Sequence, residues 1–453
     1  MSTRKTRRIA LFWLLLCCGI SILWGLSLGR NLAGGLFDFK PLYYGERCLF
    51  LHDDPYRLGE TLRVYQAAGG VLPQSSEGLR QNLTWYIYPP ATSILFAPIA
   101  MLPWGTASLL WMAITAGVFI LAALLMWTLG ASYAPRVSLL LMCIILANCE
   151  TIFAAGNAAG LAVSLCMVAV WCFLRERFVP AGILCLAISL AIKPHDAGLV
   201  WLYFLLVGGV YRKRALQTLM VIVVLAVPSC LWVSSVAPHW MGELHTNLLL
   251  AEALGGNSNP GPTNPVFISS PGMIIDLQST ISAFRDDPRI YNPISYLVCG
   301  ALLVIGAVHT LRVRFSPRGV WLALAAIVPL TLLVTYHRPY DAKLLLLTVP
   351  ACALLWAEGR PIRWAAFVVS AAAIVSTADI PLTILFALSR YLHIAAAGLP
   401  GELLTAVLMR PTPLILLAMS IFYLWIYVRR DSLRDTTAGS GEPEETPLAL
   451  TQA

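Results

Sequence analysis

The chain has 453 residues, of which 58% are hydrophobic and only 12% are charged, and its mean hydropathy is +0.75. Soluble domains carry about a quarter charged residues, so this composition excludes a soluble enzyme and predicts an integral, multi-span membrane protein. The formal net charge is +8, but the basic residues form short clusters between apolar runs. This pattern is typical of membrane topology, not of nucleic-acid binding.

The apolar runs predict an all-α polytopic membrane protein with about twelve transmembrane helices. A bilayer core needs about 20 apolar residues per helix. The predicted spans are 9–29, 106–129, 137–154, 159–174, 178–193, 197–211, 215–236, 291–311, 319–336, 340–357, 363–380 and 411–428. The first run is too long for a signal-peptide core and no A-x-A-like cleavage site follows it, so we expect it to be retained. Two further stretches, 88–102 and 382–397, are expected to lie at the membrane surface.

Basic clusters agree with this count. The cluster from Arg4 to Arg8 predicts a cytoplasmic N-terminus. With twelve spans, five later clusters also fall on the cytoplasmic side: Arg175–Arg177, Arg212–Arg214, Arg312–Arg318, Arg360–Arg363 and Arg429–Arg430. A full crossing by 88–102 would place four of them outside. We therefore expect one transmembrane domain over 1–430, with extracytoplasmic loops at 30–102 and 237–290 that include juxtamembrane helices. The polar segment 431–453 is expected to be a disordered cytoplasmic tail.

Asp38 follows the first predicted span by a few residues, between Phe37 and Phe39. A carboxylate so close to a bilayer is costly unless it is solvated or paired, which makes it a functional-site candidate. The alternative is a helix cap, because Asp accepts hydrogen bonds from the free amides of a first turn. A helix from Phe39 to about Leu51 would be capped in this way, and the two roles are compatible.

The other polar residues with chemical potential gather on the predicted outer side. They are Tyr43, Tyr44, Asp53, Asp54, Tyr86, Tyr88, Asn157, Lys193, His195, Asp196, His337, Arg338, Tyr340 and Asp341. The cations among them suit a phosphate, and an isolated carboxylate suits a general base.

Each of these residues also has a local interpretation. Lys193 can extend from a helix end to the interface, and Asn157 can serve a Gly-flanked turn. Tyr86 and Tyr88 can belong to an interfacial aromatic belt. His337 and Arg338 can form an ion pair with Asp341. The convergence of the cations on one face favours a site.

Several short motifs, spread from about residue 36 to residue 345, resemble glycosyltransferase family 87, a family of polyprenol-phosphate-mannose-dependent α-mannosyltransferases in the GT-C superfamily. They are Asp38-Phe39, the Tyr-rich helix, Asp54-Pro55-Tyr56, Tyr86-Ile87-Tyr88-Pro89-Pro90, Leu102-Pro103, Gly156-Asn157, Ile192-Lys193-Pro194 and His337…Tyr340-Asp341. Two features depart from the family pattern: Asn157 stands where many members have Gln, and His195 directly follows Lys193-Pro194.

The resemblance implies a GT-C fold with an extracytoplasmic active site, and it aligns Asp38 with the catalytic base. It implies transfer of a hexose, mannose in the family, from a polyprenyl-phosphate donor to a hydroxyl of a lipid or glycan acceptor. The donor phosphate would contact Lys193, His195, His337 and Arg338. The substrates would contact Tyr43, Tyr44, Tyr86, Tyr88, Asn157, Tyr340 and Asp341. We expect a bacterial cytoplasmic membrane location, contact with membrane lipids and no nucleic-acid partner.

Direct attack by an acceptor hydroxyl would invert the anomeric centre and requires no glycosyl-enzyme. Fixed cations stabilise the departing phosphate, so no metal or other cofactor is required. A divalent metal held by Asp38, Asp53 and Asp54 is an alternative that the sequence leaves open. Three other functions also remain open: a secondary transporter, another lipid-linked-substrate enzyme such as a polymer ligase, and a non-catalytic scaffold of an envelope complex whose outer loops bind a protein. No internal repeat, which transporters usually show, is evident.

Overall fold

The computed structural model describes residues 4–31, 35–71, 83–253, 256–262, 264, 273–359, 361–391 and 399–437. The protein is 80% helical, and the described residues contain no strand. Together with the apolar helices described below, this confirms the prediction of an all-α polytopic membrane protein.

The first half of the chain contains long helices and short surface helices. They are α1 (Arg4–Asn31), α2 (Phe39–Phe50), α3 (Leu58–Ala67), η1 (Pro90–Thr92), α5 (Ser93–Ala100), α6 (Trp104–Gly130), α7 (Pro135–Leu146), α8 (Glu150–Ala155), α9 (Ala159–Arg175), α10 (Val179–Ile192), α11 (Pro194–Val207) and α12 (Gly209–Val236). Proline occupies the first turn of α7, α10 and α11, where its missing N–H breaks no helical hydrogen bond.

The second half begins with the outer segment that the sequence predicts as a loop. Its elements are α13 (Trp240–Glu252), α15 (Leu277–Ile281), α16 (Pro288–Arg312), α17 (Pro317–Val334), the 3-10 helix η2 (Asp341–Thr348), α18 (Val349–Ala357), α19 (Ile362–Ser376), α20 (Asp379–Tyr391), α21 (Leu399–Leu404), the π-helix η3 (Thr405–Met409) and α22 (Pro411–Thr437). The predicted tail therefore begins as the last turns of α22, and residues 438–453 lie outside the described part.

Within the described residues, seven helical segments are long and apolar enough to cross a membrane. They are 5–30, 104–130, 135–155, 209–236, 288–312, 317–334 and 411–429. An eighth is the pair formed by α19 and the first part of α20, which is bent by 71°. This is fewer than the twelve spans that the sequence predicts.

The other predicted spans correspond to shorter apolar helices or to a run divided between two helices. Helices α9, α10 and α11 have 17, 14 and 14 residues, and the run at 340–357 is divided between η2 and α18. Almost every side chain of α9 is buried, so its apolar sequence reflects a protein core as much as lipid contact. Hydropathy alone does not separate these two causes.

The structure describes the two stretches that are predicted to lie at the membrane surface, 88–102 and 382–397, to different extents. Residues 88–102 contain η1 and the eight-residue α5, which is too short to cross a bilayer. The second stretch, 382–397, begins inside α20, and its part from residue 392 lies outside the described residues.

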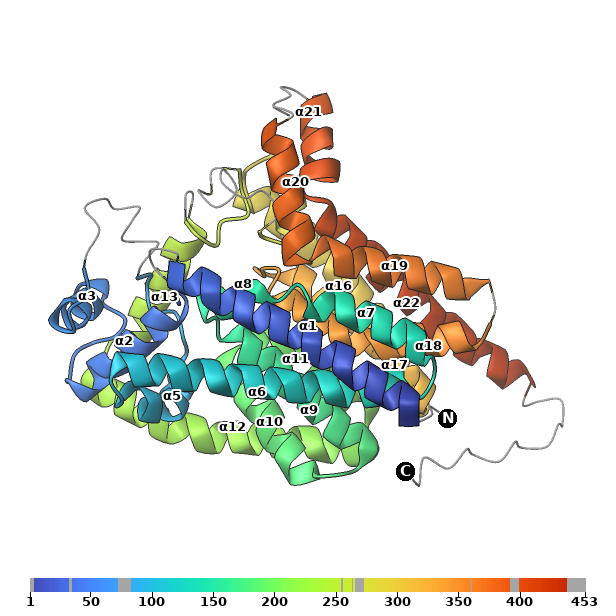
Figure 1. Ribbon diagram of the computed structural model, residues 1–453, viewed down its shortest axis with the longest axis horizontal. Coiled ribbons are helices and arrows are strands. Elements are labelled where there is room, and N and C mark those ends of the chain that lie inside the picture. The colour runs from blue at the N-terminus through green and yellow to red at the C-terminus, as the bar shows by residue number, and fades with distance from the viewer. Residues whose placement is uncertain are drawn as a thin grey trace.

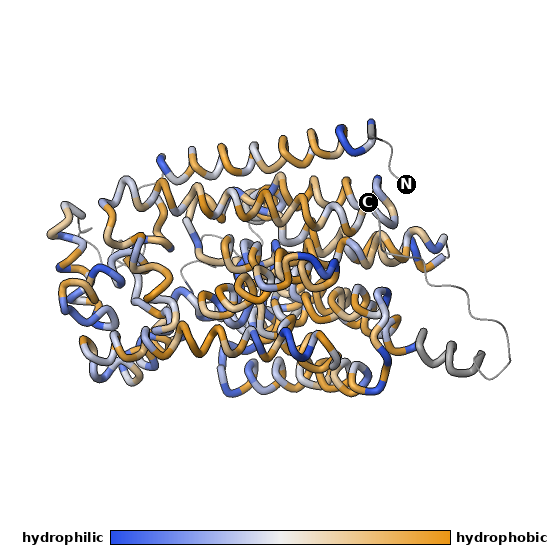
Figure 2. The backbone as a smooth tube through the Cα atoms, turned by 90° about the horizontal axis from the view of Figure 1, so that it is seen from below, coloured by the Kyte–Doolittle hydropathy of each residue, from blue (hydrophilic) through white to orange (hydrophobic). Residues whose placement is uncertain are grey.

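Helices α9, α10, α11 and α17 form the interior, with α6 and α22 packed against them. The peripheral helices α12 and α16 expose large apolar side chains, including Val224, Leu231, Leu297 and Val304. Figure 2 shows apolar residues along much of the length of the long helices. Exposed apolar surface of this extent fits contact with lipid.

The short helices α2, α3, α5 and α13 gather at one end of the bundle, at the left of Figure 1. The start of α1 and the end of α22 both lie at the other end. The bundle thus has one end built from short helices and an opposite end that holds the start of α1 and the end of α22.

Candidate functional site

Asp38 lies in the turn between α1 and α2, and its backbone is fixed to the end of α8. The amides of Leu36 and Asp38 each donate a 3.0 Å hydrogen bond, to the carbonyl oxygens of Ala154 and Ala155. Gly156 has a φ of +66°, and a Cβ there would lie 2.9 Å from the Cδ2 atom of Leu36. Glycine is thus required both by the left-handed turn and by the close approach of the Asp38 segment.

The side chain of Asp38 is held by Asn157. The Nδ2 atom of Asn157 donates a 2.7 Å hydrogen bond to Oδ2 of Asp38, and its Oδ1 atom accepts a 2.8 Å hydrogen bond from the amide of Ala159. Because Ala159 begins α9, the orientation of the Asn157 amide is set by a helix N-terminus. Asp38 occupies the N-cap position of α2 but makes no side-chain capping hydrogen bond. The capping interpretation is therefore wrong, and Asn157 is more than a turn residue.

The electrostatic surroundings of Asp38 combine burial with nearby cations. Burial raises the pKa of the Asp38 carboxyl above its ordinary value. Arg338, the Asn157 hydrogen bond and Lys193 act in the opposite direction without cancelling the effect of burial. A carboxylate with a raised pKa beside two cations is an arrangement expected of a functional base.

Lys193 lies in the break between α10 and α11, where Pro194 starts a new helix. Its Nζ atom donates to Oδ1 of Asp341 and lies 3.7 Å from Oδ2 of Asp196. It also lies 5.3 Å from the ring centroid of Tyr340, which is a favourable cation–π distance. Lys193 is mostly buried and paired with acids, so it does not extend freely from a helix end.

Arg338 lies in the segment between α17 and η2. Its amide donates a 2.8 Å hydrogen bond to Oδ2 of Asp341, and its Nη2 atom donates to the carbonyl oxygen of Asn257 at 3.1 Å. The guanidinium also lies over the ring of Tyr336, 5.7 Å from the centroid. Asp341 therefore joins Lys193 and Arg338 into one polar network.

His195 and His337 lie edge to face with ring centroids 4.9 Å apart. The Nε2 atom of His337 is 3.2 Å from Oδ1 of Asp196, and that of His195 is 3.9 Å from the same oxygen. Burial opposes protonation of His337, but Asp196 and Asp341 outweigh it and raise the pKa of the imidazole. Neither Asp196 nor Tyr336 is assigned a role by the sequence motifs, although Asp196 belongs to the polar residues of the predicted outer side and directly follows His195.

The predicted tyrosines differ in their surroundings. The hydroxyl of Tyr43 donates to the carbonyl oxygen of Leu102 at 2.7 Å, and the Tyr44 ring stacks on Trp104. The hydroxyl of Tyr86 donates to the Glu46 carboxylate at 2.5 Å. These three tyrosines are buried and pack the layer of short helices. Tyr88 and Tyr340 instead lie within electrostatic reach of Asp38.

The carboxylates of Asp53 and Asp54 do not join Asp38. Asp53 pairs with Arg63 at 2.8 Å, and Asp54 lies 3.6 Å from Arg57. A metal site built from these three acids is therefore not supported. In the described part of the chain, His195, Asp196 and His337 form the one group of ligand-type side chains close enough to share an ion.

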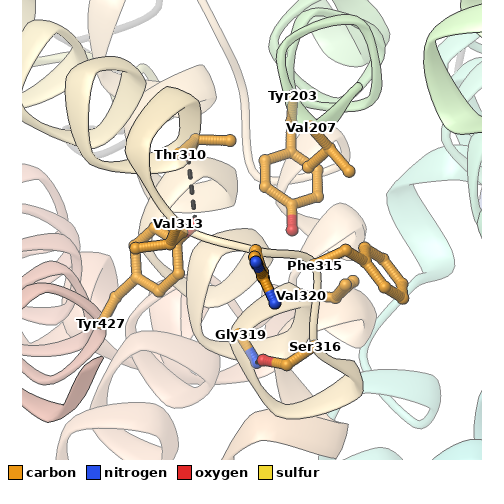
Figure 3. A pocket seen from close by; sticks show the side chains of 10 residues that line it. Tyr203, Val207, Thr310, Val313, Phe315, Ser316, Gly319, Val320 and Tyr427 are labelled. Atoms are coloured by element: carbon orange, nitrogen blue, oxygen red, sulfur yellow. Dashed lines mark hydrogen bonds between the residues drawn. The ribbon is translucent and has the colours of Figure 1, made fainter. Parts of the chain in front are cut away.

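A small pocket of about 10 Å³ lies elsewhere, near the connection between α16 and α17 (Figure 3). Its lining includes Tyr203 and Thr310, and the hydroxyl groups of Thr310 and Tyr427 are 3.2 Å apart. Helix α17 separates this pocket from the segment of His337 by about 27 Å, given its 18 residues. A cavity of this size holds about one water molecule, so it is not a substrate site.

Comparison with known protein families matches residues 86–276 to glycosyltransferase family 87. No curated protein and no solved structure matches the chain. Asn157, Lys193 and His195 lie inside the matched range, whereas Asp38 and His337 lie outside it. The described geometry brings the two sets together in one site.

Proposed function

Since the chain is a membrane glycosyltransferase of family 87, we propose that it transfers a hexose from a polyprenyl-phosphate donor to an acceptor hydroxyl, with Asp38 as the general base. Mannose is the sugar that the family resemblance favours, and a lipid or glycan supplies the hydroxyl. One observation carries the proposal: Asp38 is oriented by Asn157 and lies within electrostatic reach of Lys193 and Arg338.

The reaction follows from these groups. The acceptor oxygen attacks the anomeric carbon while Asp38 takes the hydroxyl proton. The bond between that carbon and the phosphate oxygen breaks, and its electron pair stays on the phosphate. The cations Lys193 and Arg338 stabilise the developing negative charge, which is the main way a fixed site lowers such a barrier. Attack from the face opposite the phosphate inverts the configuration of the sugar.

The arrangement of the helices supports an extracytoplasmic site. Asp38 directly precedes α2. Helix α2 lies with α3, α5 and α13 at the end of the bundle away from the start of α1 and the end of α22 (Figure 1). If the basic N-terminal cluster is cytoplasmic, as the positive-inside rule predicts, the site faces the other side of a bacterial cytoplasmic membrane.

The test uses the purified full chain with a radiolabelled polyprenyl-phosphate hexose and an extract of membrane lipids and glycans. Covalent transfer of label to an acceptor, lost in Asp38→Asn, is the expected result. Movement of label into sealed vesicles without a new covalent product would instead indicate a transporter. Transfer of the phosphate together with the sugar would indicate a different lipid-linked-substrate enzyme. Either outcome overturns the proposal.

A further inference from the structure

The side chains of His195, Asp196 and His337, here called the histidine–aspartate cluster, converge beside the proposed sugar site. Each offers one metal-binding atom, and these atoms all lie within 4.8 Å of one another. His195 and Asp196 come from the first turn of α11, and His337 comes from the segment after α17. The sequence predicts that His195 and His337 contact the donor phosphate, but the Nε2 atom of each faces Asp196, so phosphate binding alone does not explain the cluster.

The hydrogen bonding of His337 presents a lone pair to Asp196. Its Nδ1 atom is 2.7 Å from the carbonyl oxygen of Thr335, which can only accept, so Nδ1 carries the proton that is donated. In the neutral ring, Nε2 is then an unprotonated acceptor facing the carboxylate oxygen at 3.2 Å. Two acceptors at this distance repel each other, so either a proton on Nε2, which the raised pKa of His337 favours, or a metal ion must lie between them. Histidine ligands of metals commonly donate their other N–H to a backbone carbonyl in this way.

When His337 is neutral, four buried polar atoms of the cluster have no hydrogen-bond partner. These atoms are both carboxylate oxygens of Asp196 and the Nε2 atoms of His195 and His337. The side chains of Asp196 and His337 are fully buried. Lys193 does not satisfy Asp196, because it is 3.7 Å away and donates to Asp341. A buried carboxylate in this state is costly, and either a proton on His337 or a bound cation offsets that cost.

We propose that the histidine–aspartate cluster binds one divalent cation of the zinc class. Two imidazoles and one carboxylate are the ligand set of open, three-ligand zinc sites, which keep a fourth position for water or substrate. Ligand atoms about 2 Å from a tetrahedral ion lie about 3.3 Å apart. The separations of 3.2 and 3.9 Å from Oδ1 of Asp196 are near this value. His195, whose side chain is 34% exposed, provides the route of entry.

The charges nearby give the cation a function. Among the described residues of the site, Asp38, Asp196 and Asp341 face Lys193 and Arg338, and His337 adds a third positive charge when it is protonated. A divalent ion in place of the His337 proton adds one more positive charge and strengthens the attraction of the site for an anionic phosphate.

The experiment measures metal content and not sugar transfer. The full chain is purified in detergent, stripped with a chelator and titrated with Co²⁺, whose visible absorption reports four-coordinate binding. One equivalent of Co²⁺ with these bands, displaced by Zn²⁺, is the expected result. His195→Gln and His337→Gln should each weaken binding by more than about 100-fold, beyond the 10–100-fold effect of changes around the ligands. His245→Gln, at an exposed position of α13, is the matched control and should bind normally.

If the wild-type protein binds no equivalent of Co²⁺, the proposal is overturned. The atom between His337 and Asp196 is then a proton. Retention of the metal by both histidine variants would also overturn it. If His337→Gln does not fold, His195→Gln decides, because His195 is partly exposed. Asp38→Asn should keep its full equivalent of metal, so the metal site and the sugar-transfer proposal can fail independently.

Discussion

The amide nitrogen of Asn157 donates a 2.7 Å hydrogen bond to the carboxylate of Asp38, across 119 positions of the chain. The same Asn157 side chain accepts from the first amide of α9, so neither its position nor its orientation is free. Asp38 is thereby attached to the helix core, although it lies in a turn. A base fixed in this way does not need the substrate to orient it.

Replacement of Asp38 by Asn should lower turnover about 10²–10⁴-fold, the usual contribution of a positioned base. The change is nearly isosteric, and Asp38 makes no capping hydrogen bond, so expression and thermal stability should change little. Steady-state transfer of radiolabelled hexose measures the effect. Asp53→Asn, in the same outer segment but paired with Arg63, is the control and should remain active. Wild-type turnover in Asp38→Asn would refute the assignment.

The pH dependence of kcat/KM should report the raised pKa of Asp38. A general base is active only when deprotonated, so activity falls as pH decreases through the pKa of the group in the free enzyme. Because burial raises that pKa, the acidic limb of the profile of kcat/KM against pH should have its midpoint above about 3.9, the ordinary pKa of Asp. An acidic limb at or below that value would contradict the role of Asp38.

Asn157→Ala should reduce kcat/KM about 10–100-fold, since a hydrogen bond to a charged group contributes about 1.5–3 kcal/mol. The Asn157 hydrogen bond lowers the pKa of Asp38, so its loss should also move the acidic limb to higher pH. A purely structural effect would lower stability without moving the limb. Asn247→Ala, a buried Asn that donates to Tyr56 and Tyr86 carbonyls in the outer layer, is a matched control. Equal pH profiles in wild type and Asn157→Ala would exclude the positioning role.

Sequence could predict the helical class, the helix after Asp38 and the residues that converge, because apolar runs and short motifs are local signals. It predicts more spans than the described residues have helices of full spanning length, since α9 is short, apolar and buried inside the protein. It also could not find the Asn157–Asp38 bond or the role of Asp196. These depend on contacts between segments more than 100 residues apart, for which a single chain carries no pattern.

Glu46 should make the protein less stable as pH rises from about 5 to 8. It is buried in α2, and burial raises its pKa to about 7, although hydrogen bonds with Tyr86 and Ser93 act in the opposite direction. The folded state therefore holds a proton that the unfolded state releases near pH 4.5. This contribution to stability is complete below the unfolded pKa and is lost as pH rises through the folded pKa.

Glu46→Gln should accordingly raise stability above pH 7 by up to about 3 kcal/mol and change it little at pH 5. Thermal unfolding midpoints in detergent across this pH range measure the difference. Glu176→Gln, at an exposed position, is the control. If Glu46→Gln shows the same pH dependence as wild type, Glu46 does not carry the effect.

Lys343 should be essential for joining η2 to two breaks in the helical bundle. Its Nζ atom donates to the carbonyl oxygens of Asn148 and Thr377 and lies 3.4 Å from Oδ1 of Asp379. Asp379 in turn accepts from the amide and hydroxyl of Thr151 at 2.9 and 2.7 Å. The pair thus connects η2 to the start of α8 and to the bend between α19 and α20.

Lys343→Met should destabilise the fold by about 3–5 kcal/mol, because Asp379 is left as a buried, uncompensated charge. The double variant Lys343→Met/Asp379→Asn should recover much of this loss, since it removes both charges. Thermal unfolding in detergent compares the variants. Arg318→Met, which breaks the more exposed pair with Glu358, should cost no more than about 1 kcal/mol. The single variants Lys343→Met and Asp379→Asn each lose some free energy of unfolding. If the loss in the double variant equals the sum of these two losses, the side chains act independently and the pair does not join these elements.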